Sequence, residues 1–220
     1  MSDIPRPVLV NIADLLEHLA VPPERIRLVP APGQATEDDA LRHRLCELID
    51  GVLVEKPMGY YESRMAVALI YFLERYLDVN PCGFLLDGSG LIRVSQEQLR
   101  LPDVSYISWE HFPGRKLPKG SVLALVPDLP VEILSTSNTK LEMARKRNEY
   151  FAGGAKLVWE VDPETRTVEV FTAADVWTTL DENATLDGGT LLPGFTLAIR
   201  DWFARAGERD VTVLTAGLRR

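Results

Sequence analysis

Three consecutive segments decide the fold: DLPVEILS at residues 128–135, KLEMARKRNEYFA at 140–152 and KLVWEV at 156–161. The first and third are short and rich in Val, Ile and Leu, which predicts two strands. The middle segment has the length of a helix, and Gly153-Gly154 ends it. The series therefore predicts a strand, a helix and a second strand.

The flanking sequence extends this pattern in both directions. Apolar residues recur at intervals of three and four through Tyr60–Asp78, which predicts the longest helix. Val104–Ile107 and Arg166–Phe171 are predicted strands. The order of helix, strands, helix and strands is typical of an α/β or α+β fold, with one mixed sheet flanked by helices.

Two hairpins are predicted from turn signals. Asp50-Gly51 separates the apolar runs 45–49 and 52–55, and Asp87–Gly90 separates 83–86 from 91–94. Such turn residues between apolar runs favour hairpins. The remaining chain predicts strands around 176–180 and 190–196 and a terminal helix near Trp202.

The beginning of the chain predicts an extension of helix and hairpin character. Residues 1–35 contain a short amphipathic helix, Ile12–Leu19, and a proline-rich connection. A capping box at Thr36–Asp39 then starts another helix. We expect residues 36–220 to form a single domain.

Composition limits the classes of function. The 220 residues include 24 Lys and Arg against 32 Asp and Glu, a net charge of −8. This balance argues against binding nucleic acid through bulk charge, although it allows a local basic patch. No run approaches the ~18 apolar residues of a membrane span, and the first residues lack a signal-peptide pattern. We therefore expect a cytoplasmic protein without a membrane partner.

Two carboxylates interrupt predicted strands. Asp103 begins the strand 104–107, and Glu132 lies inside PVEILS. A carboxylate among apolar strand residues is costly to bury unless it meets a cation or hydrogen-bond donors. The two could share Mg²⁺, which commonly takes one or two carboxylates. Alternatively, each faces solvent at a strand end.

The following helix offers a cation. At 100° per residue, Lys146 lies on the flank of the apolar face, one turn before Tyr150. Its ammonium could reach the sheet while its stem packs, or it could be a solvated surface lysine. Arg147 falls in the middle of the apolar stripe, which the helical wheel does not explain.

Read with their neighbours, these residues resemble a known superfamily. The matching segments are 55–63, Leu101–Ser105, Val131–Ser135, Asn138-Thr139, Lys146 with Tyr150, Val158–Pro163 and Leu192–Phe195. In this order they are similar to the PD-(D/E)XK nucleases, and more closely to the restriction-endonuclease branch, a bacterial domain long filed as of unknown function. The resemblance implies a restriction-endonuclease-like core of helix, three strands, helix and strand.

The resemblance also implies an activity, the metal-dependent hydrolysis of DNA phosphodiester bonds. Asp103 and Glu132 would hold Mg²⁺ or Mn²⁺, and the backbone carbonyl of Ile133 is a further candidate ligand. Lys146 would orient or help deprotonate the attacking water. Glu62 matches an auxiliary acidic position, and Tyr150 would position Lys146 or pack beneath the site.

One departure affects the catalytic lysine. The superfamily usually places it two residues after the second acid, where this chain has Leu134. The role then moves to Lys146 on the next helix. A nuclease-fold protein without activity, acting in binding or as a scaffold, is the alternative, and a phosphoesterase acting on small nucleotides is another.

The expected partners are DNA and a second copy of the chain. Nucleases that cut both strands often pair two sites by two-fold symmetry, so a homodimer is expected. An acidic chain needs a local basic patch beside the site to bind DNA. Its candidate residues are Lys116, Lys119, Lys140, Arg145, Lys146 and Arg147.

Overall fold

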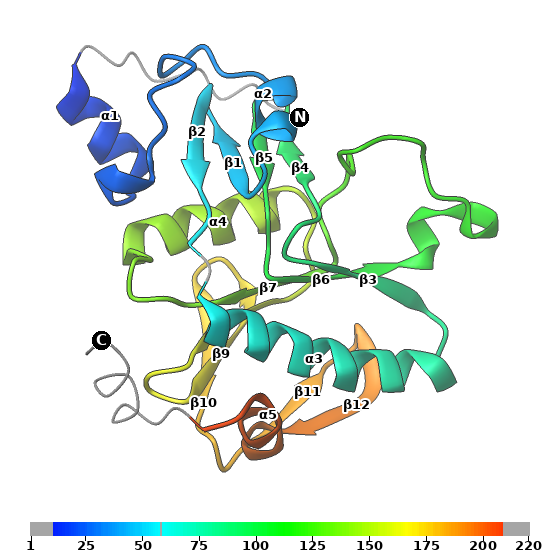
Figure 1. Cartoon of the computed structure of the whole chain (residues 1–220). Helices are drawn as coiled ribbons and strands as arrows, with labels where there is room; N and C mark the ends of the chain where they lie inside the picture. Colours follow the sequence, from blue (N-terminus) through cyan, green and yellow to red (C-terminus); the bar gives the residue numbers. More distant parts are fainter. Residues whose placement is uncertain (1–10, 58, 209–220) are drawn as a thin grey trace, which may run out of the picture.

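The computed structural model describes residues 11–57 and 59–208 (Figure 1). Six strands form the main sheet, in the order β10-β9-β8-β7-β6-β3. Their bounds are β3 Gly83–Asp87, β6 Val104–Ser108, β7 Leu129–Ile133, β8 Val158–Asp162, β9 Thr167–Ala173 and β10 Val176–Leu180. Strands β7 and β8 are parallel and the other neighbours are antiparallel, so the sheet is mixed.

Helices cover both faces of this sheet. On one face, α3 (Tyr60–Val79) and α5 (Ile199–Ala206) pack with the two-stranded sheet of β11 (Thr185–Gly188) and β12 (Leu192–Ala198). On the other face lies α4 (Lys140–Ala152), whose buried Tyr150 contacts side chains of the sheet. The predicted α+β arrangement of a mixed sheet flanked by helices is therefore confirmed.

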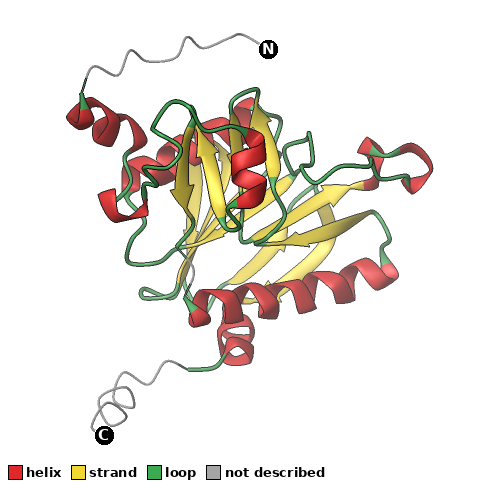
Figure 2. Ribbon diagram, turned by 45° about the horizontal axis from the view of Figure 1, so that its top comes forward, coloured by secondary structure: helices red, strands yellow, loops and turns green. Residues whose placement is uncertain are grey.

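A four-stranded sheet lies beyond α4 (Figures 1 and 2). Its order is β2-β1-β5-β4, and every neighbouring pair is antiparallel. The bounds are β1 Cys46–Ile49, β2 Val52–Glu55, β4 Ile92–Ser95 and β5 Gln98–Arg100. The short helix α2 (Glu37–Arg42) begins with the predicted capping box and contacts β1.

The described part of the N-terminal segment packs on this smaller sheet. Helix α1 (Ile12–Leu19) buries Leu15 and Leu19 against apolar residues of β1 and β2. After the turn η1 (Pro23–Arg25), the Arg25 guanidinium forms a buried ion pair with Glu142 of α4 at 2.8 Å. Three parts of the predicted regions lie outside the described residues: residues 1–10 of the extension, residues 209–220 of the domain, and Met58 of the matching segment 55–63.

Most predicted elements are confirmed, but the second hairpin is wrong. Strand β3 pairs with β6 in the main sheet, whereas β4 pairs with β5 in the smaller one. The turn itself forms, because Asp87 accepts hydrogen bonds from the backbone and hydroxyl of Ser89. The pairing differs because β4 buries Ile92 and Val94 on the α4 side, and this burial lies outside the reach of a local turn signal.

Two strands escaped prediction. β5 has three residues, of which two are Gln98 and Arg100, and β11 contains Asp187 and Gly188. Neither offers the apolar alternation that identifies a strand. Because β4 and β5 belong to the second sheet, the expectation of one sheet across residues 60–171 is also corrected.

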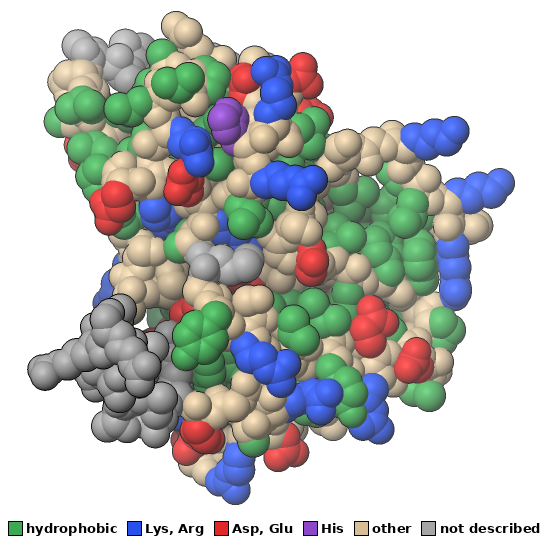
Figure 3. Space-filling view, viewed as in Figure 1, with side chains coloured by type: hydrophobic (Ala, Val, Ile, Leu, Met, Phe, Trp, Pro, Cys, Tyr) green, Lys and Arg blue, Asp and Glu red, His purple; other side chains and the backbone are tan. Residues whose placement is uncertain are grey.

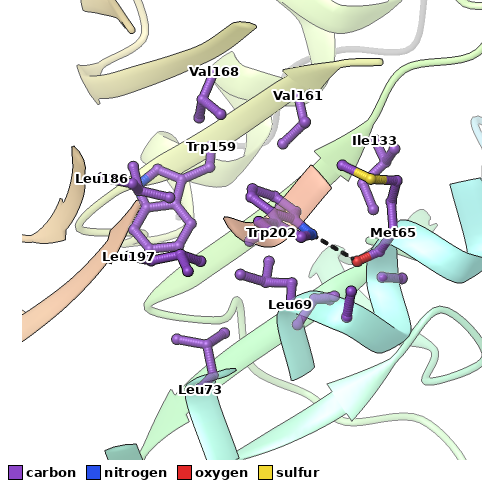
Figure 4. Close-up of a cluster of buried hydrophobic side chains, with 14 of the residues drawn as sticks. Met65, Leu69, Leu73, Ile133, Trp159, Val161, Val168, Leu186, Leu197 and Trp202 are labelled. Atoms are coloured by element: carbon purple, nitrogen blue, oxygen red, sulfur yellow. Dashed lines mark hydrogen bonds between the residues drawn. The ribbon is translucent and has the colours of Figure 1, made fainter. Parts of the chain in front are cut away.

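The core around α3 is built on two tryptophans (Figure 4). Trp159 of β8 and Trp202 of α5 are completely buried. The Trp202 indole N–H donates a 2.9 Å hydrogen bond to the backbone carbonyl of Met65 in α3. This bond fixes α5 to α3, and so it helps to hold the layer beneath the main sheet.

We expect the substitution Trp202→Phe to lower the free energy of unfolding by about 2 kcal/mol. It removes part of a buried ring and leaves the Met65 carbonyl with one fewer partner. Urea unfolding measures the change. Trp177→Phe is the matched control, since Trp177 is 54% exposed on β10, and a loss as large in this control would contradict the prediction.

Candidate active site

Acidic residues form a row across four strands of the main sheet. Val104 of β6 lies opposite Val131 of β7, and this antiparallel register, continued by one residue, sets Asp103 opposite Glu132. Glu132 pairs with Glu160 of β8, and Glu160 pairs with Glu169 of β9. Residues in register share a face, and here it is the face toward α4, since Val104 and Val131 face the α3 core.

Asp103 is held by a lysine and a backbone amide. Its carboxylate is buried; one oxygen accepts a 2.6 Å hydrogen bond from the Ile133 backbone N–H. The other oxygen lies 2.8 Å from the Nζ of Lys56, which follows β2. The alternative of a solvated carboxylate at a strand end is therefore wrong for Asp103.

Glu132 is buried as well, and α4 supplies both of its partners. Lys146 Nζ lies 3.1 Å from one carboxylate oxygen, and the Tyr150 hydroxyl donates a 2.5 Å hydrogen bond to the other. Lys146 is 1% exposed, so it is not a solvated surface lysine. The structure thus brings Glu132, Lys146 and Tyr150 together, with Asp103 on the neighbouring strand.

The hairpin of the smaller sheet adds two charged residues to the network, Glu47 and Lys56, and neither was predicted from the sequence. Glu47 of β1 is fully buried, with Lys146 Nζ 3.1 Å away and the Arg100 guanidinium 2.8 Å away. The signal was present, because Glu47 interrupts an apolar strand as Glu132 does. Lys56 belongs to the matching segment 55–63 but received no role.

Arg147 now has an explanation. Its guanidinium makes two hydrogen bonds of 2.8 and 3.0 Å with Glu160 and lies 4.4 Å from the centre of the Phe171 ring. The apolar stripe of α4 therefore carries Arg147 because the sheet beneath it presents a carboxylate and an aromatic ring.

Charged neighbours separate the pKa values of the two buried glutamates that contact Lys146. Burial raises the pKa of Glu132 to about 7; Lys146 opposes this, and the charges of Asp103 and Glu47 add to it. For Glu47, two cations outweigh the cost of burial, and its pKa is lowered to about 2. The carboxylates around Lys146 raise the pKa of its ammonium against the effect of burial. Lys146 therefore keeps its proton.

The structure also places the two remaining predicted site residues, Glu62 and Ile133. Glu62 is buried in the first turn of α3, and its carboxylate lies against Gly59, where a Cβ would collide with it. Ile133 donates its backbone N–H to Asp103, and its backbone carbonyl is the group predicted to hold a metal. Their catalytic and metal-binding roles stay predictions.

The donor chemistry at the acidic pair suits a hard cation. Among the described residues, no group of three or more His, Cys, Asp or Glu is arranged to hold a metal ion. The two carboxylates and a backbone carbonyl nevertheless form an all-oxygen set, and Mg²⁺ is commonly bound through one or two carboxylates with waters in its remaining positions. The residues present therefore fit Mg²⁺ or Mn²⁺ better than a metal that needs nitrogen or sulfur ligands.

The predicted basic patch is only partly beside this pair. Lys116 and Lys119 are exposed on the loop that joins the end of β6 to the start of β7. Asp103 precedes β6, and the loop begins and ends at the opposite end of that strand, which is roughly 17 Å long at ~3.4 Å per residue. Figure 3 shows basic side chains where this loop projects. The expectation that these lysines flank the acids is wrong.

The helical candidates for the patch are mostly occupied. Arg145 pairs with Asp50 and Glu149, while Lys146 and Arg147 hold the acidic row. Lys140, at the start of α4, is exposed.

A cleft of about 820 Å³ lies at the far end of β6, lined by residues that include Tyr76, Cys82, Tyr106 and Lys156.

Most of the chain matches a known protein family. The model of the family described as "Uma2: Putative restriction endonuclease" matches residues 38–200. The chain belongs to this family. The predicted restriction-endonuclease-like branch is thereby confirmed, and a nuclease-like function is supported at the level of the family.

A solved structure shows the same fold. The crystal structure of a "putative nuclease belonging to DUF820" from Anabaena variabilis ATCC 29413 superposes with a TM-score of 0.66. The identity is 19%, over 77% of this chain and 97% of that one. A search of curated proteins found no match. Among the described residues, no helix is long and apolar enough to cross a membrane.

We expect Lys146→Met to lower the free energy of unfolding by about 3–5 kcal/mol. The change leaves Glu132 and Glu47 buried without their common cation, and breaking a buried ion pair from one side is strongly destabilising. Denaturant unfolding measures it. The exposed Lys140→Met, on the same helix, should change stability by less than about 0.5 kcal/mol. Equal losses in the two variants would show that the buried ion pairs of Lys146 do not stabilise the fold.

The pKa of Glu132 predicts a pH dependence of stability. Its value rises from 4.5 to about 7 on folding, so the folded protein holds more protons than the unfolded chain between these values. The free energy of unfolding attributable to Glu132 therefore falls as the pH rises from 4.5 to 7. Urea unfolding across this range should show a shallower fall in Glu132→Gln than in the wild type. The exposed Glu24→Gln should keep the wild-type slope.

Proposed function

We propose that the chain is a divalent-metal-dependent endonuclease that hydrolyses DNA phosphodiester bonds. The observation that carries this is the pair Asp103 and Glu132, two buried carboxylates in register on adjacent strands. Lys146 of α4 contacts the carboxylate of Glu132. Like charges directly opposite each other destabilise a sheet. The pair therefore lowers the stability of the fold, and a metal-binding role in a nuclease accounts for its presence.

In this proposal Asp103, Glu132 and the Ile133 carbonyl hold Mg²⁺ or Mn²⁺. The ion, when bound, supplies Lewis acidity at the phosphate and lowers the pKa of a water. The water oxygen would attack phosphorus and release a proton to solvent, the bond from phosphorus to the leaving sugar oxygen would break, and that oxygen would take a proton from solvent. Lys146 is an ammonium, so its part is to orient the water and to offset negative charge. Of the two roles predicted for it, orientation is favoured over deprotonation.

The remaining roles follow from position. Tyr150 holds the second oxygen of Glu132 and so fixes the carboxylate next to Lys146. Glu62 is proposed as an auxiliary acid at the start of α3. We also propose a cytoplasmic homodimer that presents two such sites to the two DNA strands.

Two observations bear on other functions. All four oxygens of Asp103 and Glu132 have protein partners, which suits a nuclease fold that only binds or acts as a scaffold. The displacement of Lys116 and Lys119 from the acidic pair suits a smaller nucleotide substrate. Duplex DNA, a short single strand and a dinucleotide phosphodiester, tested in parallel, separate these functions.

We expect Asp103→Asn and Glu132→Gln each to lower Mg²⁺- or Mn²⁺-dependent cleavage of DNA by at least about a hundredfold, because each removes a charged metal ligand. The assay follows a labelled plasmid and an oligonucleotide at fixed metal and salt concentrations. Asp201→Asn is the control, exposed on α5, and should cleave at the wild-type rate. Cleavage unchanged in both site variants would assign the activity to a contaminant or another site.

A further inference from the structure

The cation that contacts Asp103 comes from outside the main sheet. Lys56 follows β2 of the smaller sheet, and its side chain is only 3% exposed. Its Nζ lies 2.8 Å from the Asp103 carboxylate and 3.4 Å from the Gly88 carbonyl. A lysine that loses its hydration to reach one carboxylate is a built contact rather than a surface pair.

Lys56 differs from Lys146 in how firmly it is held. Lys146 lies between two carboxylates, those of Glu47 and Glu132, each 3.1 Å away. Lys56 has one carboxylate and one distant carbonyl. Of the two ammonium groups at the acidic pair, Lys56 is therefore the easier one to displace.

The acidic pair already has cations in contact with it. Lys56 contacts Asp103, Lys146 contacts Glu132 and Glu47, and Arg100 contacts Glu47 and Glu149. A divalent cation that bound to Asp103 would meet the positive charge of Lys56, whose Nζ lies beside a carboxylate oxygen of that residue. Two cations that contact the same carboxylate repel each other, and the repulsion is stronger in a partly buried site than in water.

We propose that Lys56 is the resident counter-ion of Asp103, which occupies the electrostatic place of the divalent cation and must leave Asp103 when the cation binds. This inference rests on the proposed function, because it takes Asp103 as a metal ligand. Lys56 is a positioning residue. In the metal-free protein it neutralises Asp103 and holds the carboxylate in place, and it sets the concentration of divalent cation that is needed for binding.

The test measures binding of Mn²⁺ alone, by calorimetry and by the electron paramagnetic resonance signal of free Mn²⁺. The variants are Lys56→Met, which keeps the apolar stem, and Lys156→Met as the matched control. Lys156 also pairs with a buried aspartate, Asp128, at 3.1 Å, but at the other end of the sheet. We expect Lys56→Met to bind Mn²⁺ about tenfold or more tightly than the wild type, and Lys156→Met to bind it as the wild type does.

Thermal unfolding gives a second readout that does not need activity. Without metal, Lys56→Met should melt at a lower temperature, because Asp103 loses its counter-ion. Saturating Mn²⁺ should then raise its melting temperature more than that of the wild type. The double variant Lys56→Met with Asp103→Asn should respond to Mn²⁺ in neither assay.

The outcomes distinguish this inference from the proposed function. If the wild type binds Mn²⁺ and Asp103→Asn abolishes the binding, but Lys56→Met binds no more tightly, the role of Lys56 is overturned and the nuclease proposal stands. If neither the wild type nor Lys56→Met takes up Mn²⁺, both proposals are overturned.

Discussion

A row of carboxylates across the main sheet is the constraint on which the structure depends. Asp103, Glu132, Glu160 and Glu169 occupy one line over four strands, and three of them are buried. Neighbouring like charges in a sheet repel, and burial strengthens the repulsion. Whatever packs on this face must therefore bring cations to particular positions along the row, and apolar area alone does not suffice.

Helix α4 and the smaller sheet meet this constraint together. The consecutive residues Lys146 and Arg147 reach Glu132 and Glu160 on adjacent parallel strands. The hairpin of β1 and β2 places Glu47 beside Lys146 and Lys56 beside Asp103. The smaller sheet thus contributes charge as well as cover, and α4 is held between two sheets by ion pairs on both sides.

The sequence sufficed where a local rule decides the outcome. Gly153 ends α4, and Asp50-Gly51 turns the first hairpin. Asp103 and Glu132 are visible because a carboxylate stands out among apolar strand residues, and Lys146 because the helical wheel places it beside the apolar face, one turn before Tyr150. Long-range choices were not visible: β4 follows a sound turn, yet pairs with β5 because of what it buries against α4. Glu47 and Lys56 enter the site for the same reason, since only the docking of two sheets brings them there.

Assembly from distant segments has a consequence for the nascent chain. The contacts of Glu47 with Arg100 and Lys146 join residues 53 and 99 positions apart, so each contact closes a long loop at a cost in entropy. Synthesis must pass Lys146 before the cluster can exist. Until both sheets have met, the carboxylates stay solvated and lack their arrangement. The arrangement of these charges is therefore a property of the folded molecule, and a fragment that ends before Lys146 cannot form it.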